Sequence, residues 1–162
     1  MRAVPRVLLL LACLTLSLSG AVWAQKLTFL VTGGSPVAFP NATEANYDAG
    51  LVGATAMLGF SMSLGGGGGA VSRTGILSIR AASAVMGGTK PIGDLQWRRS
   101  DLATWNSLTP SDVVVQSQPM IRGGLNDPWT NSIAFRTLLS WANDGPATYT
   151  PTIVMTATLT TP

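Results

Sequence analysis

Few side chains in this sequence have the chemistry of an active site. The chain contains no histidine, and its single cysteine, Cys13, lies near its start. Zinc sites and nucleophiles of the Ser-His or Cys-His kind therefore lack their key member. Seven carboxylates remain, in expected loops or strand ends: Glu44, Asp48, Asp94, Asp101, Asp112, Asp127 and Asp144. A glycosidase needs two carboxylates across a cleft, and no spacing here favours a particular pair. We predict that the protein is not an enzyme.

Metal and cofactor sites have little support in the sequence. Asp48 lies near Asn46, and Asp127 follows Asn126, so either pair could contribute to a calcium site. No loop has the alternating series of oxygen ligands that calcium-binding loops use, and the Gly and Pro neighbours favour turn-forming roles. The glycines of residues 65–69 lack the following helix and lysine of a phosphate-binding loop. We predict no metal and no cofactor.

Tryptophans in expected loops are the best candidates for contact with a ligand or partner. Trp105 and Trp129 lie in loop-like surroundings, whereas Trp97 and Trp141 lie in strand patterns and are expected in the core. Exposed loop aromatics stack on sugar rings or fill a partner's pocket; alternatively, they seal the ends of the fold. The candidate contact residues are two aromatic and two polar side chains: Trp105, Trp129, Asp101 and Asn126.

The clearest structural pattern lies at the end of the chain, from Thr148 to Thr160. Its even positions carry threonine except at Val154, and its odd positions are apolar: Tyr149, Pro151, Ile153, Met155, Ala157 and Leu159. Side chains alternate across a strand with period two, so this pattern predicts a strand with one apolar and one hydroxylated face. Threonine is also β-branched and fits a half-exposed pleated surface.

Further strand patterns predict an all-β fold. The expected strands are Lys26 to Thr32, Leu51 to Leu64, Val71 to Ala82, Asp94 to Arg98, Val113 to Ser117 and Ile133 to Trp141. The glycines of residues 65–69 are expected at a hairpin tip, and residues 40–50 and 119–129 are expected to be loops. No segment has a convincing helical pattern. About seven to eight strands at hairpin-like spacing predict a single antiparallel β-sandwich over residues 25–162.

One turn adds a resemblance to a known class of domain. Asp144, Gly145 and Pro146 form a turn motif, and Tyr149 follows at the start of the last strand. This arrangement resembles the tyrosine corner and closing turn of exported bacterial immunoglobulin-like domains. The resemblance implies an immunoglobulin-like sandwich. The chain departs from antibody-type domains because residues 25–162 contain no cysteine pair.

The first 24 residues have the pattern of a secretory signal peptide. Arg2 and Arg6 precede an apolar run over residues 7–18, and residues 22–24 suit a signal peptidase that cuts before Gln25. The run is too short to span a membrane comfortably. Cys13 could instead mark a lipoprotein signal, but the short run before it favours an ordinary signal-peptide cysteine. We expect a secreted protein of the periplasm or cell surface that meets the membrane only through the cleaved signal peptide.

Charge and composition narrow the function classes. Without Arg2 and Arg6 the chain has eight basic and seven acidic residues, and its longest basic run is Arg98-Arg99. Nucleic-acid binding needs clustered cations, so we expect no nucleic-acid partner. A low-charge exported sandwich predicts a structural or interaction protein, a subunit of a surface, matrix or filament of the adhesion type. Its partners would be itself or other envelope proteins, through edge strands such as Lys26 to Thr32. The alternative is a carbohydrate-binding module that contacts a glycan through the loop tryptophans.

Overall fold

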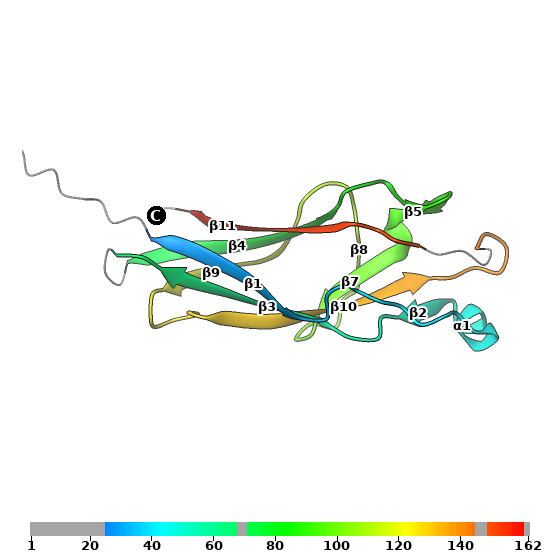
Figure 1. The fold of residues 1–162 in the computed structure, drawn as a ribbon, viewed down its shortest axis with the longest axis horizontal. Helices are drawn as coiled ribbons and strands as arrows, with labels where there is room; N and C mark the ends of the chain where they lie inside the picture. The colour runs from blue at the N-terminus through cyan, green and yellow to red at the C-terminus, as the bar shows by residue number, and fades with distance from the viewer. Residues whose placement is uncertain (1–24, 68–70, 145–148, 161–162) are drawn as a thin grey trace, which may run out of the picture.

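The computed structural model describes residues 25–67, 71–144 and 149–160, and these form an all-β structure with antiparallel sheets (Figure 1). The signal peptide predicted for residues 1–24 lies outside the described residues. The six-strand sheet has the order β1 (Lys26–Gly33), β3 (Leu58–Gly65), β10 (Trp129–Leu138), β7 (Leu95–Arg99) and β8 (Asn106–Ser107), and β2 (Leu51–Gly53) also pairs with β10.

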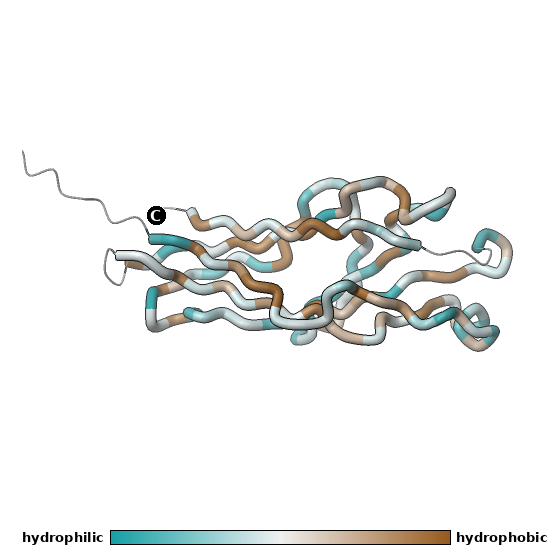
Figure 2. Tube along the Cα trace, in the orientation of Figure 1, coloured by the Kyte–Doolittle hydropathy of each residue, from teal (hydrophilic) through white to brown (hydrophobic). Residues whose placement is uncertain are grey.

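A second sheet faces the first and shares its core. This three-strand sheet has the order β11 (Ile153–Thr160), β4 (Ser72–Ala81) and β9 (Val113–Ile121). The smaller elements are the paired strands β5 (Val85–Gly87) and β6 (Lys90–Pro91), the helix α1 (Glu44–Ala49) and the 3-10 helix η1 (Ile92–Asp94). Hydrophobic and polar residues alternate along the strands (Figure 2). The most buried large side chains come from both sheets and from Leu108, which follows β8: Phe60, Met62, Leu77, Ile79, Leu95, Leu108, Met120 and Ile133.

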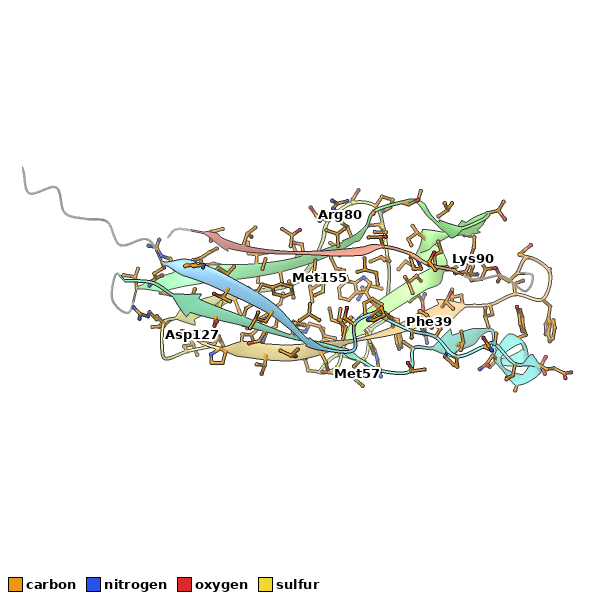
Figure 3. All side chains as sticks on the ribbon, in the orientation of Figure 1. Phe39, Met57, Arg80, Lys90, Asp127 and Met155 are labelled. Carbon is orange, nitrogen blue, oxygen red and sulfur yellow. The ribbon has the colours of Figure 1, made fainter. Side chains whose placement is uncertain are left out.

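The alternation predicted for the last strand is confirmed. Along β11, the exposed threonines are Thr156, Thr158 and Thr160. Ile153, Met155, Ala157 and Leu159 pack against the core, and Met155 points into the space between the sheets (Figure 3). The strand begins at Ile153, which is five residues later than the pattern indicates.

Two predictions near the N-terminal half of the domain are wrong in detail. Residues 40–50, expected to be a loop, contain α1, which has a capping box between Thr43 and Asn46 and ends at Gly50 with φ 71°. A helix of six residues is too short for hydrophobic periodicity to show it. The expected strand from Leu51 to Leu64 is divided into β2 and β3, and both parts pair with β10.

The glycine-rich segment does not connect a hairpin. β3 pairs with β1 and β10, whereas β4 pairs with β11 and β9, so the chain crosses from one sheet to the other between Gly65 and Ser72. Residues 68–70 of this segment lie outside the described residues. Period-two patterns identify strands but carry no information about which strands pair, so adjacent patterns were misassigned as one hairpin.

The loop predicted between Pro119 and Trp129 is also shorter than expected. β9 continues to Ile121, and β10 begins at Trp129 rather than at Ile133. β10 ends at Leu138, so Trp141 lies beyond it and is 62% exposed, which contradicts its predicted place in the core. Trp141 instead stacks on Tyr47 of α1, with ring centroids 4.5 Å apart, and donates a hydrogen bond to Asp48 Oδ1 at 3.1 Å.

Candidate functional site

The four candidate contact residues do not form one site. Trp129 begins β10, and its ring packs edge-on against Phe60 at 5.0 Å, so it seals the core instead of projecting from a loop. Trp105 contacts Arg136, which lies seven residues farther along β10 than Trp129. Seven residues of extended strand span about 23 Å, so one small ligand cannot contact both tryptophans.

Asn126 and Asp127 hold the turn that precedes β10. Asn126 has a positive φ of 54°, and its side-chain Nδ2 donates to the carbonyl of Pro119 at 2.8 Å. Asp127 accepts from the backbone N–H of Leu64 at 2.8 Å and of Gly123 at 2.7 Å. These side chains therefore satisfy backbone groups, which is the usual role of Asx residues in turns.

The carboxylate of Asp101 is hydrogen-bonded to Arg99, whose side chain also bonds to a strand of the other sheet. Arg99 Nε and Nη2 donate to its two carboxylate oxygens at 2.8 and 2.5 Å. Arg99 Nη1 donates to the carbonyl of Val115, at 3.3 Å, and to Gln116 Oε1, both on β9 of the other sheet. The hydrogen bonds from Arg99 lower the pKa of Asp101 to about 2. Asp101 is thus an ionised partner of Arg99.

Trp105 has a different environment, which we call the Trp105 cluster: Trp105, Arg98, Arg136 and Gln96. The guanidinium carbon of Arg136 lies 4.3 Å from the centroid of the indole, and that of Arg98 lies 4.9 Å from it. Gln96 Oε1 accepts a hydrogen bond from Arg136 Nε at 2.7 Å. The sequence indicated Trp105 but not its arginines, because their approach depends on the pairing of β7 with β8 and β10.

A buried ion pair lies at the end of the molecule near the last turn. The side chain of Lys90 is 1% exposed, and its Nζ lies 2.7 Å from Asp144 Oδ1 and 2.9 Å from Asp94 Oδ2. Burial alone would lower the pKa of Lys90, but hydrogen bonds and charge interactions with Asp144 and Asp94 outweigh it and raise the pKa. The two carboxylates therefore hold a charged lysine in place. The predicted turn at residues 145–146 lies outside the described residues.

The two sheets leave an opening along one side, which we call the seam. One lip is β1 and its irregular continuation through residues 34–39, where the carbonyl of Ala38 accepts from Thr55 N at 2.9 Å. The other lip is β11 and the residues before it. A cavity of about 350 Å³ lies between the lips. A second cavity of about 640 Å³ adjoins it at Val37, Phe39 and Pro151 and extends towards α1, β2 and the end of β10. The deeper lining includes Phe29, Leu58, Leu95, Ile153 and Met155, and no charged residue lines either cavity.

The seam lies between two unpaired strand edges. Among the described residues, β1 pairs only with β3, and β11 pairs only with β4. β1 and β11 lie side by side across the seam (Figure 1). Leu30 and Val31 of β1 are 57% and 46% exposed. An edge of this kind presents backbone N–H and C=O groups that another strand can pair with.

Residues 25–67, 71–144 and 149–160 contain neither a candidate metal centre nor a membrane-spanning helix. No group of three or more His, Cys, Asp or Glu side chains comes together there in a way that could hold a metal ion. No helix within that part of the chain has the length and apolar character needed to cross a membrane.

Comparison of this chain with protein-family models, with curated proteins and with solved structures finds no match.

Proposed function

We propose that this chain is an exported, non-enzymatic structural or interaction protein of the periplasm or cell surface, and that its contact surface is the seam. In this proposal residues 1–24 are a cleaved signal peptide, and the two sheets form an immunoglobulin-like sandwich. The observation that carries the proposal is the pair of neighbouring free edges, β1 and β11, on either side of an opening that no charged residue lines.

The occupant that best fits the seam is a second copy of the same chain. Both free edges lie on the same side of the molecule, so two copies that meet seam to seam would place each β1 beside the partner's β11. This contact is isologous, because the same patch is used twice. The exposed Val31, which lines the smaller cavity, would leave solvent, and backbone groups at both edges would gain partners.

The lining of the seam supports an uncharged partner. Neither cavity contains Asp, Glu, Lys or Arg, so a charged segment would lose hydration without gaining an ion pair. The seam of a second copy has the same uncharged composition, and it brings alternating apolar side chains on an extended backbone. The proposed contact is therefore driven by apolar burial and strand pairing.

The test is the oligomeric state of residues 25–162 by sedimentation velocity over a range of concentrations. We expect reversible association, and we expect Val31→Lys to weaken it at least about tenfold, because it places a charge at the seam. Leu125→Lys is the matched control, since Leu125 is 54% exposed and lies in the turn before β10, away from the seam. A protein that stays monomeric at every concentration, or equal loss of association in both variants, would overturn the proposal.

A further inference from the structure

The Trp105 cluster lies on the outer face of the six-strand sheet, and strand pairing explains how it forms. Leu95, Trp97 and Arg99 of β7 point into the core, so Gln96 and Arg98 point outward. Arg98 lies opposite Ala134 and Gln96 lies opposite Arg136 in the register with β10. Trp97 pairs with Asn106 of β8, so Trp105, one residue earlier, reaches the place beside Arg98. Arg98 of β7 and Arg136 of β10 are therefore diagonal neighbours on adjacent strands, and long side chains can reach each other across that distance.

Neither arginine of this cluster has an acidic partner among the described residues. The ion pairs found there are Arg80 with Asp112, Lys90 with Asp94 and Asp144, and Arg99 with Asp101. Arg136 donates through Nε to Gln96, and the side-chain hydrogen bond of Arg98 is a long one, 3.5 Å, from Nη1 to the carbonyl of Leu102. The Nε of Arg98 is buried and has no hydrogen-bond partner among the described residues. Most of the terminal N–H groups of both guanidiniums are therefore available to a ligand.

Two guanidinium groups against one indole ring repel each other, and the cluster offers no carboxylate to offset the repulsion. The face of the partly buried indole attracts each cation, which holds the guanidinium in place without neutralising it. An anion that contacts both groups would remove the repulsion and accept the forked hydrogen bonds for which guanidinium is suited. The arrangement is thus one that an anionic ligand would stabilise.

The sheet beside the cluster has small side chains on its outer face. Ala134 is opposite Arg98, and Ser132 pairs with Gly59 of β3. Ser61 continues this row opposite Thr130. Larger side chains border this row: Met57 is 51% exposed with its Sδ 3.5 Å from Ser132 Oγ, and Leu30, which is 57% exposed, lies opposite Ser61. The shallow part of the surface is therefore the strip at Ala134 next to Arg98, where a polymer can pass with its anionic groups at the arginines.

We propose that the Trp105 cluster is a binding site for an acidic polysaccharide, in which carboxylates borne on the sugar rings contact Arg98 and Arg136. The apolar body of Trp105 packs beside the sugar, and its ring positions both guanidiniums. The site is separate from the seam, since β1 and β8 are opposite edges of the six-strand sheet. It does not depend on self-association.

Other polyanions fit these features less well. Nucleic acids need a longer track of cations, and residues 25–162 have only a small excess of basic side chains. Anionic membranes also favour extended basic patches and apolar side chains that insert between lipids. Two neighbouring guanidinium groups on the outer face of a sheet suit a flexible polysaccharide that carries one carboxylate on each sugar ring.

The test is binding of residues 25–162 to sodium polygalacturonate, measured by affinity gel electrophoresis and titration calorimetry at low salt. Three other polymers are compared with it. Dextran is a neutral polysaccharide, sulfated dextran carries sulfate in place of carboxylate, and polyuridylate represents nucleic acids. Arg98→Gln and Arg136→Gln remove the proposed contacts singly. Arg122→Gln is the matched control, because it removes the same charge from an exposed position after β9. Near-ultraviolet circular dichroism confirms that each variant is folded.

We expect polygalacturonate to bind, dextran not to bind, and each of the two variants to lose about tenfold or more in affinity while Arg122→Gln is unchanged. Sulfated dextran that binds through the same two arginines would extend the site to anionic sugars in general. The proposal is overturned if no acidic polysaccharide binds, if Arg122→Gln weakens binding as much as the cluster variants, or if polyuridylate binds as tightly.

Discussion

Lys90 is a buried charged residue that is paired with carboxylates. Its ammonium group is almost completely buried, and Asp144 and Asp94 each accept a hydrogen bond from it. Asp144 Oδ2 also accepts from the backbone N–H of Ser140 at 2.8 Å, so the same carboxylate holds the chain that follows β10. A buried charge is tolerated only when it is paired and hydrogen-bonded, and the structure meets that condition.

Removing the charge of Asp144 should therefore be costly. We expect Asp144→Asn, which keeps the shape of the side chain, to lower the free energy of unfolding by about 2–4 kcal/mol, because the buried Lys90 would keep only one carboxylate partner, Asp94. Asp94→Asn should cost less, since the Asp94 side chain is 32% exposed while that of Asp144 is 6% exposed. Urea denaturation measures both changes. An equal loss in the two variants would contradict this account.

The ion pair between Asp101 and Arg99 should contribute to the stability of the protein in acid. Its pKa is about 2 in the folded state against 3.8 ordinarily, so its contribution is present above pH of about 4 and is lost as the pH falls towards 2. We expect Asp101→Asn to be less stable at neutral pH and to show a shallower loss of stability over this window. The effect is modest because the Asp101 side chain is half exposed. Thermal unfolding from pH 6 to pH 2 checks it, and parallel curves for the two proteins would count against it.

At the scale of elements, β4 offers a direct test of which face is the core. Ile79 is fully buried, whereas Ile76 lies on the outer face of the same strand and is only partly buried. We expect Ile79→Ala to cost about 2–4 kcal/mol and Ile76→Ala less than about 1 kcal/mol, because only the first opens a cavity. Chemical denaturation of both variants measures the difference, and the pair controls for residue type and strand. Similar losses would mean that the inner face has been misassigned.

Period-two alternation was sufficient to place most strands and their buried faces. The odd positions of β11 and the even positions Leu58, Phe60, Met62 and Leu64 of β3 face the core as the sequence indicates. Strand pairing was not predictable in this way, because alternation fixes a face and not a neighbour. The predicted environments of Trp129 and Trp141 are wrong for that reason. Pairing with β3 and β2 sets the ends of β10, so Trp129 lies in the strand and Trp141 lies beyond it.

The candidate site was predictable only in part. Trp105 was identified from its loop-like surroundings, but the two arginines that approach it were not, since Arg136 lies 31 residues farther along the chain. The sequence makes Asp101 and Asn126 candidate ligand contacts, because short polar side chains in loops serve both ligands and turns. Their partners, Arg99 and the carbonyl of Pro119, become visible only in three dimensions.

At the scale of the whole molecule, the proposed contact surfaces lie on opposite sides and differ in chemistry. The seam is uncharged and lies between β1 and β11, whereas the Trp105 cluster is cationic and lies beside β8. Apart from these regions, most described carboxylates already bond to a cation, an indole or a backbone amide. Long-range electrostatics should therefore contribute little to association of the domain with itself.

This difference in charge predicts that salt weakens polysaccharide binding at the Trp105 cluster but does not weaken self-association at the seam. Screening shortens the reach of exposed charges, so raising sodium chloride from about 0.05 to about 0.5 M should weaken polygalacturonate binding several-fold. Over the same range self-association at the seam should be unchanged or slightly stronger, because apolar burial and backbone pairing involve no net charge. Sedimentation velocity and calorimetry on one preparation measure both responses, with Arg136→Gln and Val31→Lys as the variants that remove each binding mode. Self-association that falls with salt as steeply as polysaccharide binding would show that charge, rather than the apolar seam, brings the copies together.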